Sequence, residues 1–148
     1  MARARGRQTW DEAGLGVLEL VATTVIVAVL LGLSLTHWNG YRAQQRLRYG
    51  TAQLATDLRQ AQERAKMERR QYTVTLTAGS RAYQITSADG AFVENATLPD
   101  GVTPTASTTV VFQPFGQPAS AYTLTVQNST GTGTVTVTLR GGITYATP

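Results

Sequence analysis

An apolar segment from Leu15 to Leu35, "LGVLELVATTVIVAVLLGLSL", constrains the fold of this chain more than any other feature. As a helix, this segment would be about 31 Å long, which is enough to cross the hydrocarbon core of a bilayer. Its single charge is Glu19, and a charge at membrane depth costs roughly 2.5–3.5 kcal/mol on insertion scales. The acid therefore needs an explanation.

The residues after the apolar segment are typical of a membrane boundary. Trp38 and Tyr41 stand where an interfacial aromatic belt is expected, His37 lies at the headgroup boundary, and Arg42 begins the aqueous side. Arginines are equally numerous on the two sides, so the positive-inside rule does not decide the orientation; they are Arg3, Arg5 and Arg7 before the segment and Arg42, Arg46 and Arg48 after it.

Helical periodicity continues beyond the boundary, from Tyr41 to Arg70. Apolar residues spaced 7, 4, 3 and 4 apart define one helix face: Leu47, Leu54, Leu58, Ala61 and Ala65. Because no proline occurs before Pro99, we expect one helix from about Leu15 to Arg70, with weak points at three glycines, Gly32, Gly40 and Gly50. A helix of this length cannot fold back on one small domain, so its first half must lie in a membrane or against other chains.

The composition changes after Gln71, where runs rich in Thr, Val and Tyr alternate with turn residues. The expected strands are 72–77, 82–86, 108–113, 121–127, 134–139 and 143–146. Alternation in the later strands, Tyr122/Leu124/Val126 and Val135/Val137/Leu139, predicts an antiparallel sheet with one buried face. The "NSTGTG" stretch reads as a hairpin loop, and residues 87–107 as a looser region with a turn at Pro99. The fold class is α+β, with a long N-terminal helix packed on an antiparallel β-domain.

Gly14 stands directly before the apolar segment, behind a short charged leader, and Glu19 is the fifth residue after it. This pattern resembles the cleavage and methylation signal of type IV prepilins and type II secretion pseudopilins. The resemblance implies that a prepilin peptidase cuts between Gly14 and Leu15 and methylates Leu15. It divides the chain into a leader (1–14), a transmembrane and filament-core helix (15–35), an amphipathic continuation (36–70) and a pilin-like β-domain (71–148).

The late strands resemble the GspH/FimT group of minor pseudopilins and pilins. In that group a strand ending in Phe-x-Pro-x-Gly precedes two further strands, and Phe112, Pro114 and Gly116 match this pattern. The resemblance implies a single-pass protein of the inner membrane, with its C-terminal domain outside the cytoplasm. Its implied partners are other filament subunits, the prepilin peptidase, the inner-membrane assembly platform and membrane lipid.

Elementary electrostatics offers a role for Glu19. Cleavage would create an α-amino group at Leu15, one helical turn away, and a carboxylate near a helix N-terminus is stabilised by the helix dipole. In a stack of helices Glu19 could instead pair with the Leu15 amine of a neighbour. Since a buried charge left alone is costly, such a pair would favour one axial register. The alternative is a tolerated acid with no role, in a plain signal anchor.

Residues 42–70 carry eight cations and three acids, so DNA binding must be considered. The resemblance also admits a DNA-binding minor pilin for transformation, or a major pilin of a thin pilus. Against a DNA site, the acids are interleaved, and Arg59/Glu63, Arg64/Glu68 and Glu63/Lys66 have helical pairing distances. In the C-terminal part only Arg140 offers a nucleic-acid contact. A solvated or intersubunit charge face is favoured.

The composition argues against an enzyme. The chain has no cysteine and one histidine, so we expect no metal site, no cofactor and no catalytic residues. The glycines of "NSTGTG" lack the strand-to-helix context of a phosphate loop. The "TVTVTL" run could be an exposed edge strand, although an ordinary half-buried strand is the favoured interpretation.

Overall fold

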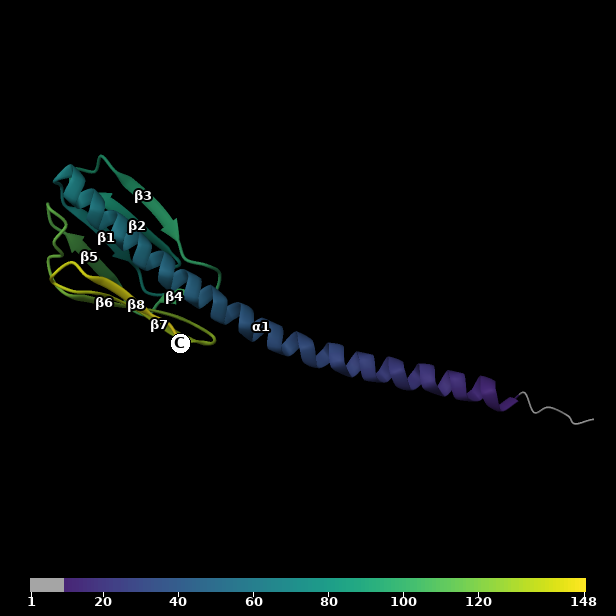
Figure 1. Cartoon of the computed structure of the whole chain (residues 1–148). Helices are drawn as coiled ribbons and strands as arrows, with labels where there is room; N and C mark the ends of the chain where they lie inside the picture. Colours follow the sequence, from purple (N-terminus) through teal and green to yellow (C-terminus); the bar gives the residue numbers. More distant parts are fainter. Residues whose placement is uncertain (1–9) are drawn as a thin grey trace, which may run out of the picture. The chain divides into compact units, whose positions relative to one another are not determined.

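The computed structural model describes the backbone of residues 10–148 and the side chains of residues 16–32 and 39–148. The chain divides into two compact units, with the boundary between Asn39 and Gly40. The helix α1 (Trp10–Glu68) supplies the described part of the first unit and the first element of the second (Figure 1). The next residue, Arg69, has a positive φ of 54°, and this left-handed turn ends the helix.

Within residues 40–148 the strands form two four-stranded antiparallel sheets. The first sheet has the order β3-β2-β1-β5, and its strands are β1 (Tyr72–Leu76), β2 (Ala82–Ser87), β3 (Val93–Thr97) and β5 (Thr108–Phe112). The second has the order β4-β6-β7-β8, with β4 (Thr103–Pro104), β6 (Tyr122–Asn128), β7 (Gly131–Val137) and β8 (Ile143–Ala146).

The prediction of a single sheet was therefore wrong. β5 returns to pair with β1, and the chain then crosses to the second sheet after a bridge between Phe112 and Pro118. A helix about 10 Å across covers about two strands that lie about 4.8 Å apart. Splitting the strands into two sheets lets both apolar faces reach the same helix.

The region from 87 to 107 is more regular than expected, because it contains β3 and β4. The sequence of β3, "VENAT", has low strand propensity, and its exposed and half-buried residues alternate without a fully buried face. Hydrophobic patterning therefore could not reveal it. The expected turn at Pro99 is present: the Val102 N–H donates to the Pro99 carbonyl at 3.1 Å, and Gly101 has a φ of 81°.

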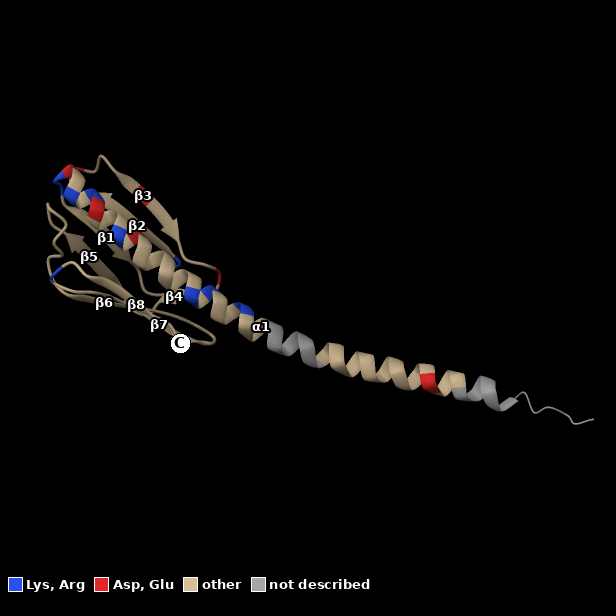
Figure 2. Cartoon of the chain, in the orientation of Figure 1, with Lys and Arg blue, Asp and Glu red and all other residues tan. Residues whose placement is uncertain are grey.

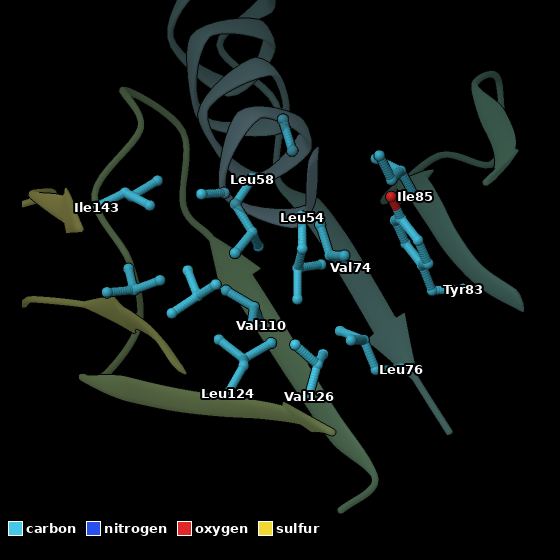
Figure 3. Packing of buried hydrophobic residues seen from close by; sticks show 14 of the residues in the cluster. Leu54, Leu58, Val74, Leu76, Tyr83, Ile85, Val110, Leu124, Val126 and Ile143 are labelled. Atoms are coloured by element: carbon cyan, nitrogen blue, oxygen red, sulfur yellow. The ribbon is translucent and has the colours of Figure 1, made fainter. Parts of the chain in front are cut away.

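The core lies between the C-terminal half of α1 and the two sheets. The predicted helix face is confirmed, since its five members have no exposed surface: Leu47, Leu54, Leu58, Ala61 and Ala65. Figure 3 shows Leu54 and Leu58 pointing from the helix toward Val74 and Val110 of the first sheet and Leu124 of the second. Burial of this shared face therefore holds the two sheets to one helix.

The helix and the second sheet approach each other closely at Gly133, in the middle of β7. A Cβ atom at this position would lie 2.1 Å from Thr51 Oγ1. The Thr51 hydroxyl is fixed by its own 2.7 Å hydrogen bond to the Leu47 carbonyl.

The hairpin loop expected at "NSTGTG" is shorter than predicted. β7 already begins at Gly131, so only residues 129 and 130 make the turn.

Leu139 is also misplaced by the sequence pattern. Alternation predicts that it is buried with Val135 and Val137, but β7 ends at Val137 and Leu139 is 63% exposed in the turn that follows. The turn is closed by Gly141, which has a φ of 84° and donates its N–H to the Thr138 carbonyl at 2.8 Å. A tight turn of this kind reverses the chain before the alternation can continue.

We expect Gly133→Ala to lower the free energy of unfolding by about 1–3 kcal/mol, because the new methyl group overlaps the Thr51 hydroxyl. Thr51→Ala in the same chain should recover part of the loss. A double-mutant cycle by urea denaturation measures this coupling. Gly79→Ala is an instructive control, since open space surrounds that position and only its positive φ opposes the substitution. Additive effects of the changes at 133 and 51 would contradict the contact.

Candidate functional site

The described part of the first unit is a helix with no covered apolar side. Every side chain from residue 16 to residue 32 is exposed, including large residues such as Val17, Leu18 and Ile26, at 66%, 70% and 59%. Glu19 is exposed as well and is the only charged residue in this range. An apolar helix of this kind requires another apolar environment to cover it.

The two threonines in this range bond within the helix. The Thr23 hydroxyl donates to the carbonyl of Glu19 at 2.9 Å, and the Thr24 hydroxyl donates to that of Leu20 at 2.6 Å. Their polar groups are thereby satisfied without water, so they fit an apolar surrounding. No helix among the residues whose side chains are described combines the length and hydropathy that a membrane span needs.

Several residues predicted from the sequence lie partly or wholly outside the described residues. Gly14 and Leu15 belong to the backbone of α1, but their side-chain surroundings are not described, and the same holds for Trp38. The leader is described only from residue 10. Tyr41, the second predicted interface residue, is 59% exposed.

Two arginines of α1 hold the C-terminal strand of the second sheet. Arg59 Nη2 donates to the Ile143 carbonyl at 2.8 Å, and Arg48 Nη2 donates to the Pro148 carbonyl at 3.1 Å. Hydrogen bonds with a charged donor are stronger than neutral ones, and here they satisfy carbonyls at the open edge of β8. These cations therefore act within the domain.

Two further arginines lie over aromatic rings. The Arg64 guanidinium carbon is 4.2 Å from the centroid of Phe92, and that of Arg69 is 5.9 Å from the centroid of Phe115. Both distances lie within the range of a cation–π contact. Arg64 of the helix and Arg69, the residue after it, thus contact the loop between β2 and β3 and the loop between β5 and β6. Figure 2 shows the basic residues along α1.

The turn between β2 and β3 is tied to the end of the helix by an ion pair between Arg70 and Asp89. Asp89 also accepts hydrogen bonds from the Ser87 hydroxyl at 2.6 Å and from the Ala91 N–H at 3.2 Å. These donors, first of all Ser87, favour the ionised carboxylate and lower the pKa of Asp89.

Of the three ion pairs expected on the helix surface, one forms. Lys66 Nζ lies 2.7 Å from Glu63 Oε1. Arg59 and Arg64 bind the β8 edge and the Phe92 ring instead. Seven of the eight cations in residues 42–70 remain exposed, which agrees with a solvated charge face, and several of them also bind groups of their own domain.

The Phe-x-Pro-x-Gly motif closes the domain around the C-terminal end of α1. Phe112 is fully buried in the core and Pro114 is half-buried. Gly116 has a φ of 78°, and a Cβ atom there would lie 2.4 Å from Lys66 Cγ. Glycine therefore serves both the turn and the close approach to the helix.

Gln62 is a structural residue that the sequence analysis missed. It is buried, and its Nε2 donates to the carbonyls of Gly116 and Gly141, both at 3.0 Å. It thereby joins the loop after β5 to the turn after β7. A signal was available, because Gln62 lies four residues after Leu58 and three before Ala65, which places it beside the apolar helix face. Arg140, the predicted nucleic-acid contact, is exposed in that second turn.

A shallow hollow of about 300 Å³ lies on the first sheet. It is lined by uncharged residues: Thr75, Thr77, Ala82, Tyr83, Gln84 and Asn95. Among the residues with described side chains, no group of three or more His, Cys, Asp or Glu is arranged to hold a metal ion. The hollow contains no carboxylate and no histidine.

The comparison with protein families identifies a relationship for most of this domain. The family model described as "Type II transport protein GspH" matches residues 50–142, more than half of the chain. The chain belongs to the GspH family. No curated protein and no solved structure matched this GspH chain.

Membership supports a type II secretion pseudopilin-like subunit, since GspH is a family of structural pseudopilins. It implies association with other pseudopilin subunits. The match begins at Gly50, where the helix already contacts the β-domain through the Pro99 ring. In this GspH chain the match therefore covers the packed helix face, both sheets and the Phe112 loop.

A buried tyrosine links the GspH helix to the first sheet. The Tyr83 hydroxyl donates to the Asp57 carboxylate, and Gln53 Nε2 lies 3.4 Å from the same hydroxyl. Burial, followed by the hydrogen bond to Asp57, raises the pKa of Tyr83 well above its ordinary value of 10.0. Burial and the neighbouring Glu68 likewise raise the pKa of Tyr72.

We expect the domain to lose stability as the pH rises above 10. A phenol whose pKa is higher in the folded than in the unfolded state stabilises the fold fully below the unfolded pKa and progressively less above it. Tyr83→Phe should reduce the loss of unfolding free energy by about 1 kcal/mol per pH unit above pH 10. The part of the loss that is due to Tyr72 should remain. Urea denaturation from pH 8 to 11 measures this. The exposed Tyr145 provides the control substitution Tyr145→Phe, and equal slopes in both variants would refute the assignment.

Proposed function

We propose that this GspH-family chain is a minor subunit, a pseudopilin or pilin, of a type II secretion pseudopilus or type IV pilus. The observation that carries the proposal is the family match over residues 50–142. The α+β domain adds support, because it presents one helix packed on antiparallel sheets as expected for a pilin-like subunit. The proposed role is structural and uses no cofactor.

The proposal extends to the N-terminal part of the chain. Residues 1–14 form a leader, which a prepilin peptidase removes after Gly14 before methylating Leu15. Residues 15–35 then anchor the subunit in the inner membrane, with Trp38 and Tyr41 at the interface. Residues 36–70 are the amphipathic continuation, helical as far as Glu68, and residues 71–148 complete a domain outside the cytoplasm. The support is the spacing of Gly14 and Glu19 and the exposed apolar surface from residue 16 to 32.

In this proposal the exposed apolar surface of residues 16–32 also drives filament assembly. The apolar segment leaves lipid through an assembly platform and enters a bundle of identical or related helices in the filament. In that bundle Glu19 pairs with the Leu15 amine of a neighbour and sets the axial register, because an unpaired charge in an apolar bundle is costly. The solitary charge of the described helix range therefore acts as a register mark.

DNA binding receives less support than filament assembly. Arg48, Arg59 and Arg70 bind groups of their own domain, which lowers the number of phosphates they can neutralise. Arg140 alone does not make the cluster of cations that phosphate binding needs. We therefore keep assembly as the proposed function.

We expect the chain to be shortened by 14 residues, from 148 to 134, when it is expressed in a host with an active prepilin peptidase. Intact-mass measurement of the membrane fraction should show this loss together with one added methyl group. Deleting the peptidase, or the substitution Gly14→Val, should leave the full-length chain. Gly16→Val is the matched control and should be processed. A mature mass that does not depend on the peptidase would remove the proposal.

The substitution Glu19→Ala should leave membrane insertion intact and abolish incorporation into filaments. The apolar segment loses only a charge, so insertion is unchanged or improved by roughly 2.5–3.5 kcal/mol. Glu19→Gln tests whether the charge or the shape is needed, and Thr24→Ala is a nearby control. Sheared filaments and membranes are compared by immunoblot. Normal incorporation of Glu19→Ala would instead favour a plain signal anchor.

A further inference from the structure

Two neighbouring turns present large apolar side chains at the end of the β-domain where α1 finishes (Figure 1). Phe115, in the loop after β5, is 65% exposed, and Leu139, in the turn after β7, is 63% exposed. Gln62 Nε2 donates to the carbonyls of Gly116 and Gly141, one in each turn, and thereby fixes the turns side by side. An exposed apolar pair in a defined position is a candidate contact surface.

The backbone holds the Phe115 ring outward at an energetic cost. Phe115 has a φ of 77°, a left-handed conformation that bulky residues rarely adopt. The loop enforces this conformation, because the Gly116 N–H donates to the Gln113 carbonyl at 2.9 Å and the Gln113 N–H donates to the Gln117 carbonyl at 2.7 Å. Strained residues of this kind cluster at functional sites, so the exposed ring points to a binding role.

The surroundings of Phe115 carry cations that are not neutralised. The Arg69 guanidinium carbon lies 5.9 Å from the ring centroid, and Arg140 follows Leu139 in its exposed turn. Neither arginine pairs with a carboxylate among the residues whose side chains the structure describes. The nearby acids are already engaged: Glu63 with Lys66, Asp89 with Arg70, and Glu68 with the Tyr72 hydroxyl. Arg69 and Arg140 therefore remain to attract an anion.

The hydrogen bonding of the two turns suits a bilayer surface. Six of their amides donate within the protein, those of residues 113, 115, 116, 138, 141 and 142. Few N–H groups are left for directed bonds to a partner protein, whereas a satisfied backbone approaches an apolar medium at little cost. Arg69 also stands beside the ring, and a long cationic side chain can stay among the lipid headgroups while an aromatic ring enters more deeply.

We propose that the Phe115 end, defined as the exposed residues Arg69, Phe115, Leu139 and Arg140, binds the surface of an anionic phospholipid bilayer. Phe115 and Leu139 enter the boundary between headgroups and acyl chains, and the two arginines bind lipid phosphates. Affinity of this kind combines buried apolar area with the attraction between cations and anionic lipid. The inference goes beyond the proposed filament role and involves no residue of the apolar segment from 15 to 35.

The test asks whether the full chain can hold a second bilayer. The chain is placed in nanodiscs of neutral phosphatidylcholine and mixed with vesicles that contain about 30% phosphatidylglycerol, an anionic lipid. Nanodiscs do not float by themselves, so flotation with the vesicles reports binding by the exposed domain. We expect about tenfold less flotation with pure phosphatidylcholine vesicles, and a marked reduction when the salt is raised from about 0.1 M to about 0.5 M. Equal flotation with both kinds of vesicle, or of nanodiscs without protein, would overturn the proposal.

Variants of Phe115 separate binding from folding. Phe115→Gly removes the ring and suits the positive φ, so it should reduce flotation about tenfold and leave the urea midpoint unchanged or higher. Phe115→Trp should retain flotation, because tryptophan also favours the membrane interface. Tyr145→Ser, which removes an exposed aromatic side chain from β8, is the matched control. Normal flotation of Phe115→Gly, or an equal loss in Tyr145→Ser, would contradict the assignment.

The arginines are tested in the same way. Arg69→Gln and Arg140→Gln should each weaken flotation about fivefold, which is the contribution of one cation near an anionic surface. Arg46→Gln changes an exposed cation far from residue 69 along the helix and should have no effect. Binding of the nanodiscs to beads that carry the blocked peptide Glu-Leu-Glu-Leu-Glu, without flotation on vesicles, would assign the Phe115 end to an acidic protein segment and replace the proposal.

Discussion

The structure of the β-domain depends on the burial of one helix face by two sheets. The Leu and Ala residues of the buried face, Leu47, Leu54, Leu58, Ala61 and Ala65, have no exposed surface, and both sheets contribute buried residues to the same cluster. Neither sheet has another layer to cover its apolar face within residues 40–148. Burial of one fully enclosed leucine contributes about 1.5–3 kcal/mol, so the few leucines of this face account for a large share of the marginal stability of a small domain. Because the second sheet packs directly on this helix face, Gly133 of β7 lies very close to Thr51 of α1.

Several polar residues of α1 stabilise this packing. Arg48 and Arg59 hold the β8 edge, Gln53 contacts the β3 edge, and Gln62 joins two loops. A basic stretch that looks available to DNA is thus partly consumed in docking the helix. The apolar helix range from 16 to 32 is different, because every described side chain in it is exposed. The two parts of α1 therefore differ: the apolar face of one is buried within its domain, and the apolar side chains of the other are exposed in the described structure.

How far the sequence predicts this protein differs from element to element. The helix face was identified residue by residue, because a 3.6-residue period is local information. The ends of five expected strands lie within two residues of the observed ends, because alternation along a strand is also local information. β3 was missed, since "VENAT" has no buried face and exists because β2 offers it an edge. Leu139 was misassigned because alternation does not show where a turn begins. Gln62 was overlooked because its role depends on two carbonyls 54 and 79 residues away.

The sequence alone determined the spacing of Gly14 and Glu19, the apolar segment with its single acid, the amphipathic face and the α+β class. These are properties of neighbouring residues, and short-range spacing records them. Only the tertiary structure decided the split into two sheets, the glycine contact at Thr51, the use of arginines as edge covers and the meeting of the turns that carry Phe115 and Leu139. These depend on contacts between residues far apart in the chain, and which distant groups meet is set by packing the whole domain at once.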